Sequence, residues 1–311
     1  MRTKKKRFLK YVPGFIKGKV IREKINIPDA PLLDFTFKIA TELEELEQAF
    51  RLIYRAYRLK GFIHPKTSGM HLMQQHAHPL STTFVGKLKD RVVITMSVFT
   101  DSEMGLPMDS LYKNELDRLR NKGRFIAEVG NFASEPAVRK GNQLLPMMMN
   151  NLMSRYAKKH LRLDDLVITV NPAHEFIYKH IILFQRIGKV RSYDTVNGHL
   201  AVPMLLDLNE YQRTYFKKYH GKARHKDLHR FFFITDFKNL RLPKENQILS
   251  VFDKNIYTHF FVKMAASNAI FKRDEQQFVF KLYEKYDEIL EPKVFENVRP
   301  ILVPSKKTVW T

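Results

Sequence analysis

Apolar residues along this chain recur with two different periods, and the period separates the expected strands from the expected helices. Alternating apolar and polar residues indicate a half-buried strand, whereas apolar residues three or four positions apart indicate a helix with one buried face. The first pattern, together with short apolar runs, predicts strands over residues 35–39, 83–88, 92–100, 124–134, 166–170, 190–193 and 200–208. The second pattern predicts helices over residues 41–61, 111–123, 144–156 and 173–184.

Local signals fix the ends and the buried faces of these helices. Thr41 is expected to cap the first helix, with Glu44 three residues later completing a capping box and Gly61 ending the helix. Apolar residues at helical spacing in the third helix are expected to pack in the core: Leu144, Met148, Leu152 and Tyr156.

The loop between residues 61 and 83 contains four histidines and is expected to line a site. These are His64, His71, His76 and His78. No cysteine occurs in the chain and no acidic residue joins the histidines at ligand spacing, so we do not expect a metal there.

Composition narrows the class of protein. A chain of 311 residues with 44% hydrophobic content can bury a full core. Its formal charge of +22 indicates an acidic partner, which can be nucleic acid, an anionic lipid surface or an acidic protein. The absence of cysteine excludes disulfides and thiolate catalysis. No apolar run is long enough for a membrane span, so we expect a cytoplasmic protein that is soluble or bound peripherally to the inner face of the membrane.

Charge also divides the chain into three expected regions. Residues 1–24 contain ten Lys or Arg against one Glu, interleaved with aromatic and aliphatic residues, so residues 1–30 are expected to form a basic arm for an anionic membrane surface or a solvated tail. Residues 31–219 form the expected central domain. Residues 220–311 form an expected basic, mainly helical C-terminal lobe.

Several short motifs carry a family resemblance over residues 35–208. The run 166–188 reads as a buried strand, a stop at Asn171-Pro172, and a helix followed by an aromatic residue and a glycine. The other motifs are SGM at 68–70, GLPMD at 105–109, AEV at 127–129 and AVPMLLDL at 201–208. Together they resemble the long-chain N-acyl amino acid synthases, members of the GNAT superfamily that are related to the bacterial autoinducer synthases.

The resemblance implies both a fold and an activity. The fold is α+β: a central mixed, mostly antiparallel sheet flanked by helices, in which two neighbouring strands splay apart to admit a pantetheine thioester. The activity is transfer of a long acyl chain from acyl carrier protein to the amino group of an amino acid. The implied donor is an acyl-pantetheine thioester, and no tightly bound cofactor is implied.

Glu128 is the candidate general base. Attack on a thioester needs a neutral amine, and a carboxylate flanked by Ile126, Ala127 and Val129 on a strand is expected to have a raised pKa through desolvation. The alternative is a buried structural ion pair. Strand alternation would place Glu128 and Gly130 on one face, and Gly130 would allow a bulge toward the thioester.

The superfamily resemblance implies further roles around this strand. The backbone N–H groups of Val129, Gly130, Asn131 and Phe132 are the expected source of an oxyanion donor. Tyr178 is the expected acid for the leaving thiolate, or else a packing tyrosine. His174 lies four residues earlier on the same helical face and would orient that hydroxyl, or else is a polar residue at a helix start.

A basic turn is the candidate phosphate site. Arg139, Lys140 and Gly141 precede a helix whose N-terminal N–H groups favour an anion. The turn departs from the usual coenzyme A loop of the superfamily, which favours a carrier protein over coenzyme A as donor. The overall positive charge suits an acidic carrier.

Two departures from the family affect the acceptor site and one helix end. Asn131 lies near a position where the related autoinducer synthases have an arginine, and an amide cannot neutralise a substrate carboxylate. Leu183 stands where the family often has glycine.

Two alternative functions remain open at this point. One is a coenzyme A-dependent N-acetyltransferase, and the other is a non-catalytic basic protein that binds membrane or nucleic acid, of which nucleic acid is the less expected partner. No Walker loop, Rossmann glycine fingerprint or Gly-x-Ser-x-Gly motif occurs in the chain.

Overall fold

The computed structural model describes most of the central part of the chain and a few shorter pieces toward its ends. The described residues are 18–20, 22–23, 25–27, 32–139, 144–193, 196–244, 254–263, 277–279 and 281–284. Most of the predicted basic arm and much of the C-terminal lobe lie outside these residues.

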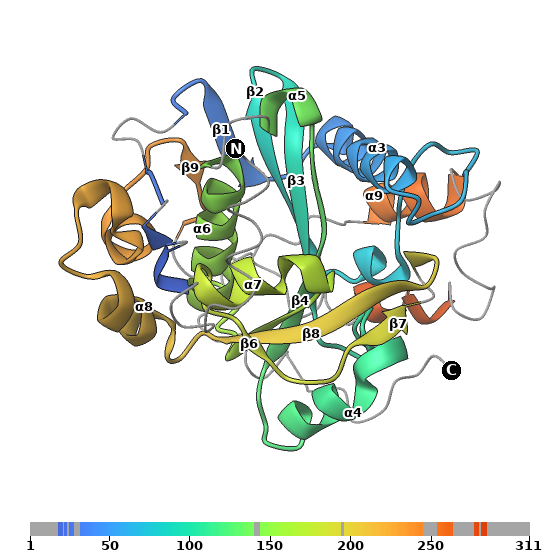
Figure 1. Ribbon diagram of the computed structural model, residues 1–311. Coiled ribbons are helices and arrows are strands. Elements are labelled where there is room, and N and C mark those ends of the chain that lie inside the picture. The colour runs from blue at the N-terminus through green and yellow to red at the C-terminus, as the bar shows by residue number, and fades with distance from the viewer. Residues whose placement is uncertain are drawn as a thin grey trace.

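One mixed sheet forms the centre of the described structure (Figure 1). Its strands are β1 (Phe35–Ile39), β2 (Thr82–Leu88), β3 (Arg91–Thr100), β4 (Ile126–Ser134), β5 (Asp165–Val170), β6 (Gln185–Arg186), β7 (Arg191–Tyr193), β8 (His199–Asp207) and β9 (Leu240–Arg241). They lie in the order β6-β8-β5-β4-β3-β2-β1-β9, and β7 pairs with β8. The β4–β5 and β1–β9 pairs are parallel and the others are antiparallel. The predicted α+β fold with a mostly antiparallel sheet is therefore confirmed.

Helices cover both faces of this sheet. They are α3 (Leu43–Leu59), α4 (Asp109–Arg120), α5 (Pro136–Arg139), α6 (Leu144–Lys159), α7 (Pro172–His180), α8 (Tyr211–Tyr219) and α9 (Lys254–Tyr257). Adjacent residues of β2 point to opposite faces. On one face Thr83 is hydrogen-bonded through Ser97 to His76, whose ring contacts α3. On the other face the Phe84 ring contacts Tyr156 of α6. The sheet therefore lies between α3 and α6.

The hydrophobic pattern predicted the core correctly, but one helix start was wrong. Leu144, Met148, Leu152 and Tyr156 are all buried, as expected. Thr41, however, is not the N-cap of the first helix.

That helix begins at Leu43 after Glu42, which makes no side-chain capping bond. Instead the Thr41 N–H donates to Oε2 of Glu45 at 3.2 Å. Glu45 is buried and also binds Lys38 and Lys87, so this cross-strand cluster, and not the expected capping box, fixes the start of the helix.

The helix predicted over residues 173–184 is shorter than expected, because it ends at His180. The Phe184 N–H returns to the Tyr178 carbonyl at 3.0 Å, with Leu183 in the left-handed region at φ +64°. The bond joins residues six positions apart and requires a left-handed residue within the turn, a backbone conformation that glycine adopts without strain.

Tyrosines of α8 hold the segment that follows α7. The Tyr215 hydroxyl donates to the Ile182 carbonyl at 3.0 Å, and the Tyr219 hydroxyl donates to the Ile181 carbonyl at 2.7 Å. Carbonyl groups at a helix end need such partners when they are buried. The residues just beyond the expected acyltransferase motifs thus stabilise the end of α7.

The described parts of the C-terminal lobe pack on the central sheet and share its hydrophobic core. The ring of Phe260 contacts Phe50 of α3, and the Tyr283 hydroxyl donates to the Ala77 carbonyl at 2.8 Å. The predicted helical segments near 247–263 and 274–289 are described only in part, at 254–263, 277–279 and 281–284. These pieces are helical.

Candidate active site

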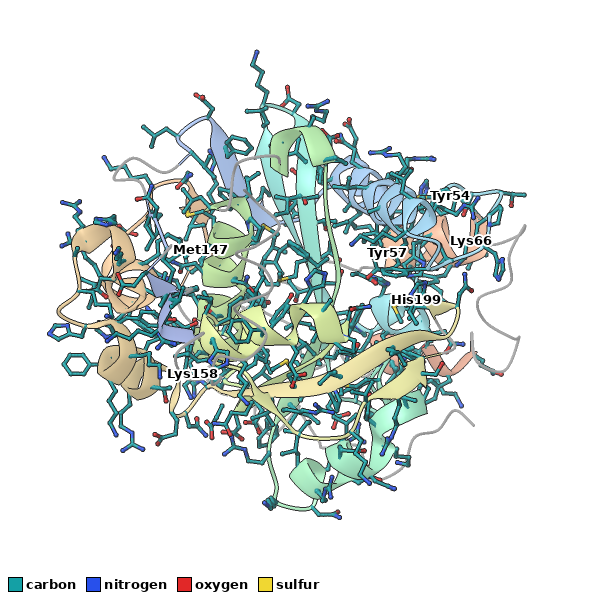
Figure 2. The ribbon with its side chains drawn as sticks, in the orientation of Figure 1. Tyr54, Tyr57, Lys66, Met147, Lys158 and His199 are labelled. Atoms are coloured by element: carbon teal, nitrogen blue, oxygen red, sulfur yellow. The ribbon has the colours of Figure 1, made fainter. Side chains whose placement is uncertain are left out.

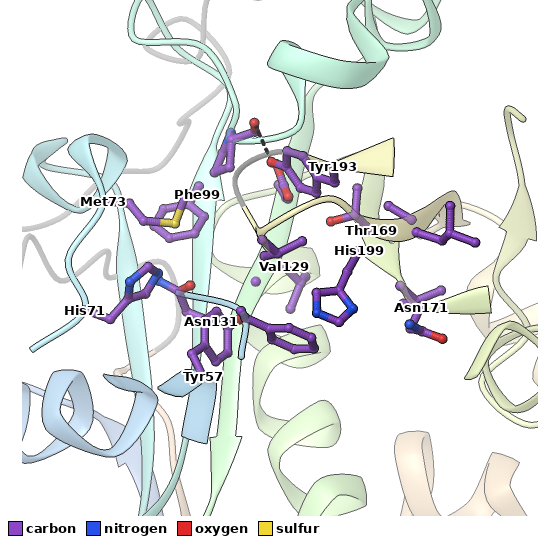
Figure 3. Close-up of a pocket in the computed structure, with 18 residues that line it drawn as sticks. Tyr57, His71, Met73, Phe99, Val129, Asn131, Thr169, Asn171, Tyr193 and His199 are labelled. Carbon is purple, nitrogen blue, oxygen red and sulfur yellow. Dashed lines mark hydrogen bonds between the residues drawn. The ribbon is translucent and has the colours of Figure 1, made fainter. Parts of the chain in front are cut away.

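Two neighbouring parallel strands separate at the centre of the sheet. β4 and β5 pair only from Ile126 with Asp165 to Glu128 with Val167. Beyond this point the strands part, and a cavity of about 160 Å³ lies between them (Figure 3). The cavity is lined by Tyr57, Phe62, His71, Met73, Phe99, Pro107, Glu128, Val129, Gly130, Asn131, Thr169, Val170, Asn171, Tyr193, Val196, His199, Leu200 and Ala201. The expected splayed strand pair is present.

A β-bulge shapes the β4 side of the cavity. Thr95 pairs with Ala133 and Ser97 pairs with Gly130, so two residues of β4 stand opposite one residue of β3. Such a bulge leaves backbone of the longer strand unpaired. The expected bulge is present, but the residue in the left-handed conformation is Asn131, at φ +50°.

Glycine is not sterically required at position 130. A Cβ added to Gly130 would lie 3.5 Å from the Phe99 ring, which is an ordinary contact. The expected simple alternation of faces is also interrupted, because residues 128–131 all line the cavity. The bulge explains this, since it rotates the strand locally.

Glu128 lies at the point where the strands part. Its side chain is buried, and its Oε2 accepts a hydrogen bond from the Met108 N–H at 2.7 Å. Burial raises the pKa of Glu128 to about 8; the Met108 N–H opposes this shift, and the charge of Asp109 adds to it. Among the described residues no Lys or Arg forms an ion pair with this carboxyl group. The structural ion-pair alternative therefore has no support here.

The hydrogen-bond donor to Glu128, the Met108 N–H, belongs to the GLPMD segment, and a buried ionic cluster holds this segment in place. Arg120 makes two hydrogen bonds to Asp109, both at 2.7 Å, and two to Asp101, at 2.7 and 2.8 Å. Asp109 also accepts from the Leu106 N–H at 2.7 Å. These bonds fix the backbone on either side of Met108. The Met108 N–H is therefore a fixed group, which stabilises one orientation of the Glu128 carboxyl.

Tyr57 of α3 and His71 of the following loop form another wall of the cavity. Their rings contact each other with centroids 5.1 Å apart. The pKa of the Tyr57 hydroxyl is raised, first by burial and then by the charge of Glu128, and Tyr57, His71 and Glu128 all line this one cavity. Burial lowers the pKa of His71 to about 4, helped by the charge of Lys66, so this imidazole is neutral at pH 7.

The side chain of Asn131 contacts a buried histidine, His76. Its amide group lies 3.2 Å from Nε2 of His76. The ring of His76 also contacts the Ser97 hydroxyl at 3.3 Å through Nε2, and Nδ1 accepts from the Met73 N–H at 3.0 Å. Burial lowers the pKa of His76 to about 3, so this network carries no charge at neutral pH. Asn131 and His76 together stabilise the bulge and do not supply a cation to the cavity.

Two of the residues expected in the catalytic machinery do not line the cavity. Tyr178 is half-buried on α7 and packs edge-on against Phe184, with ring centroids 5.8 Å apart. Burial raises its pKa, and its charge in turn raises the pKa of Tyr57. His174 is exposed, and among the hydrogen bonds of the described residues none joins it to Tyr178.

The expected phosphate site is described only at its edge. Arg139 is the last residue of α5, and its side chain, together with Lys140 and Gly141, lies outside the described residues. Phe132, expected near the oxyanion, packs against the hydrophobic core instead of lining the cavity.

Sequence reasoning missed several cavity residues, of which Tyr57 and His71 are the most important. In the sequence Tyr57 has the helical spacing of a core residue, and His71 is one of four histidines in a loop. A tyrosine among aliphatic residues on a helix face was the available signal, because a buried hydroxyl needs a polar neighbour. His71 follows the SGM motif directly, which was a second signal.

Within the described ranges, no cluster of three His, Asp or Glu side chains is placed to hold a metal ion. In the part of the chain that the structure covers, no helix is long and apolar enough to cross a membrane.

The parted strands, the bulge and the buried carboxyl define the class: this is an acyltransferase of the GNAT type. The family model for the N-acyl amino acid synthase FeeM matches residues 48–207. The chain belongs to this N-acyl amino acid synthase family, which confirms the resemblance seen in the motifs and contradicts the non-catalytic alternative.

The chain is similar to several solved structures. The structure of FeeM, an N-acyl amino acid synthase from uncultured soil microbes, is 25% identical, with a TM-score of 0.52, and covers 58% of this chain and 94% of its own. The acyl-homoserine lactone synthase LasI is 16% identical, with a TM-score of 0.42 and coverage of 56% and 90%. A ribosomal-protein-S5-alanine acetyltransferase from Vibrio fischeri is 13% identical, with a TM-score of 0.41 and coverage of 57% and 95%. No curated protein sequence matches the chain.

Proposed function

We propose that this N-acyltransferase moves a long acyl chain from the thioester of an acyl carrier protein to the α-amino group of an amino acid, with Glu128 as general base. The observation that carries the proposal is a buried carboxyl, without an ion-pair partner among the described residues, at the point where β4 and β5 part. A thioester lying between the strands would present its carbonyl carbon beside this carboxyl.

The proposed reaction has two steps. The amine nitrogen attacks the thioester carbon, the carbonyl oxygen takes the negative charge, and Glu128 accepts the proton that the nitrogen loses. The C–S bond then breaks, the carbonyl re-forms as an amide, and the pantetheine sulfur leaves with a proton from an acid. An N–H group of the bulged segment 129–132 is the proposed donor to the oxyanion, because the bulge leaves backbone there unpaired with β3.

Two tyrosines are candidates for the acid. Tyr178 is the residue indicated by the superfamily pattern, with His174 as its orienting neighbour, and Tyr57 is the tyrosine that lines the cavity. The charge of Tyr178 affects Tyr57, so the two hydroxyls lie in one electrostatic environment. Comparison of Tyr57→Phe with Tyr178→Phe distinguishes them. Replacement of the tyrosine that acts as the acid slows the step that releases the thiol. Replacement of the other tyrosine changes acceptor binding or protein stability instead.

The proposed donor is carrier protein, with coenzyme A as the alternative. The chain has a formal charge of +22, which favours association with an acidic carrier. The turn with Arg139, Lys140 and Gly141 is the proposed contact for the single phosphodiester of the carrier arm. We assign the chemistry to residues 31–219, and the basic arm, residues 1–30, to an anionic membrane surface.

Mass spectrometry of lipid extracts tests this proposal. Cells producing the wild-type chain should accumulate amino acids with long N-acyl chains, and cells producing the Glu128→Gln variant at the same level should not. Equal product from both would remove Glu128 from the mechanism. Turnover with acetyl-CoA but not with acyl carrier protein would establish the coenzyme A alternative.

A further inference from the structure

The cavity has a buried polar atom that nothing in the described structure satisfies. His71 is 7% exposed and lines the cavity, and its Nδ1 has no hydrogen-bond partner among the described residues. Figure 3 shows its ring on the same side of the cavity as Tyr57 and Asn131. Leaving a buried nitrogen unpaired costs about 1–3 kcal/mol, so such groups call for a ligand or a functional reason.

The contrast with His76 shows that burial alone does not explain this. His76 is also buried and lies five residues later, but both of its ring nitrogens have partners, in Met73, Ser97 and Asn131. The network of His76 is complete without a ligand. His71, by contrast, lines the cavity and has a ring nitrogen without a partner among the described residues.

Lys66, five residues before His71 in the same loop, is a cation without a carboxylate partner among the described residues. Lys66 is half-buried, its charge acts on His71, and burial lowers its pKa. The Tyr54 hydroxyl donates to the Lys66 carbonyl and accepts from the Lys66 N–H, which fastens the loop to α3. Figure 2 shows Lys66 with Tyr54 and Tyr57 at the same end of the molecule. An ammonium in this position lacks a counter-ion within the described residues.

The acceptor of the proposed reaction needs such a counter-ion site. The carboxylate of an amino acid requires hydrogen-bond donors or a cation when it is desolvated. Asn131 does not provide the charge, because its amide is neutral and bound to His76. No Lys or Arg is among the described residues that line the cavity.

We propose that His71 and Lys66 bind the α-carboxylate of the acceptor, His71 by a hydrogen bond from its imidazole and Lys66 by its positive charge. His71, which contacts the Tyr57 ring, and Glu128 line the same cavity, so the carboxylate of one α-amino acid would lie at His71 and its amine at Glu128. This inference rests on the proposed function and assigns the residues that select amino acids over simple amines.

The test compares matched acceptors that differ only in the carboxylate. Leucine is paired with isoamylamine and phenylalanine with phenethylamine, each assayed for kcat and KM with a long-chain acyl carrier protein thioester. His71→Leu removes the hydrogen bond and Lys66→Met removes the charge. His71→Asn retains an N–H group near the position of Nδ1, and Lys66→Arg retains the charge. Lys122→Met, at an exposed position after α4, is the control for loss of one positive charge.

The expected result is a loss confined to amino acids. A hydrogen bond to a charged group contributes about 1.5–3 kcal/mol, so His71→Leu should lower kcat/KM for the amino acid by about 10- to 100-fold, mainly through KM. Lys66→Met should lower it by about fivefold to tenfold, an effect that weakens as salt is added. Both variants should leave the matched amine within about twofold of wild type, and the two conservative variants should recover much of the loss.

The outcomes separate the inference from the function on which it rests. Equal losses for amino acid and amine, or no recovery in His71→Asn and Lys66→Arg, would overturn the carboxylate site while leaving acyl transfer intact. A wild-type enzyme that prefers the amines would overturn it as well. If the wild-type enzyme acylated none of these acceptors, the proposed function would fail, and the inference with it.

Discussion

A buried pair of aspartates, Asp101 and Asp109, lies close to the buried Glu128, and the environments of these carboxyl groups differ. Asp101 and Asp109 are neutralised by Arg120 in a compact cluster with bonds of 2.7 and 2.8 Å. Glu128 is buried to a similar degree, but among the described residues its side chain has only the Met108 N–H as a hydrogen-bond partner. The first arrangement supports the segment that leads into α4, and the second leaves a carboxyl that can take up and release a proton near neutral pH.

The comparison shows how a carboxylate that stabilises the fold is distinguished from a carboxyl that can act as a general base. A buried carboxylate with a full set of partners is held in its ionised form and cannot act as a base of useful strength. A buried carboxyl without a counter-ion has a raised pKa, which suits proton transfer at cellular pH. The two groups are linked, because the backbone held by Arg120 and Asp109 carries the N–H that binds Glu128.

The largest expected effect is the loss of activity in Glu128→Gln. General base catalysis contributes about 10²- to 10⁴-fold to rate, so kcat should fall by that amount while the protein stays folded. The amide of glutamine can still accept the Met108 N–H, and no ion pair is broken. Steady-state kinetics and circular dichroism of the same preparation check both halves of this prediction.

The next effect concerns stability and should come from the other group. Arg120→Met leaves two buried aspartates without their cation, and breaking a buried ion pair in this way costs about 3–5 kcal/mol. The midpoint of urea denaturation should fall strongly in this variant but not in Glu128→Gln. If Arg120→Met were as stable as wild type, the distinction between the two groups would be lost.

A smaller effect is the dependence of stability on pH. The pKa of Glu128 is about 8 in the folded protein and is expected near 4.5 when unfolded. The folded state therefore holds a proton that the unfolded state has released between these values. The resulting stabilisation is complete below pH 4.5 and is lost as the pH rises to about 8.

The Glu128→Gln variant lacks this contribution. Its stability relative to wild type should increase from pH 5 to pH 8 and change little above that. Urea titrations at several pH values measure the difference, and a difference that stays constant across this range would contradict a raised pKa.

The smallest predicted effect links the two groups. The charge of Asp109 raises the pKa of Glu128, so Asp109→Asn should lower it and move the alkaline rise of activity to lower pH. Asp101→Asn, which removes a charge from the same cluster, is the matched control. A shift of equal size in both variants would point to a general disturbance of the cluster instead.

Much of the fold followed from the hydrophobic pattern, because the period of apolar residues directly reflects strands and helices. Glu128 was found for a similar reason, since a lone acid in an apolar strand stands out. The errors came from contacts between distant segments. The start of α3 depends on Glu45 binding Lys87 from another strand, and the end of α7 depends on tyrosines of α8.

The same limit explains the missed parts of the site. Tyr57 has the spacing of a core residue, and only the packing of α3 beside β4 places it in the cavity that Glu128 also lines. Asn131 was recognised as unusual, but its left-handed backbone and its bond to His76 depend on the loop that carries His76. His71 and His76 look equivalent in sequence, and only the structure shows that one has partners while the other faces the cavity.

The most direct test of the central claim is the pH dependence of kcat/KM for the acceptor amine, measured with excess acyl carrier protein thioester in wild type and in Glu128→Gln. The account predicts that kcat/KM of the wild type rises with pH through a pKa of about 8. It predicts that the Glu128→Gln variant is slow and that its profile lacks the rise due to this carboxyl group. A variant with the wild-type rate and the wild-type profile would contradict the assignment of Glu128 as the base.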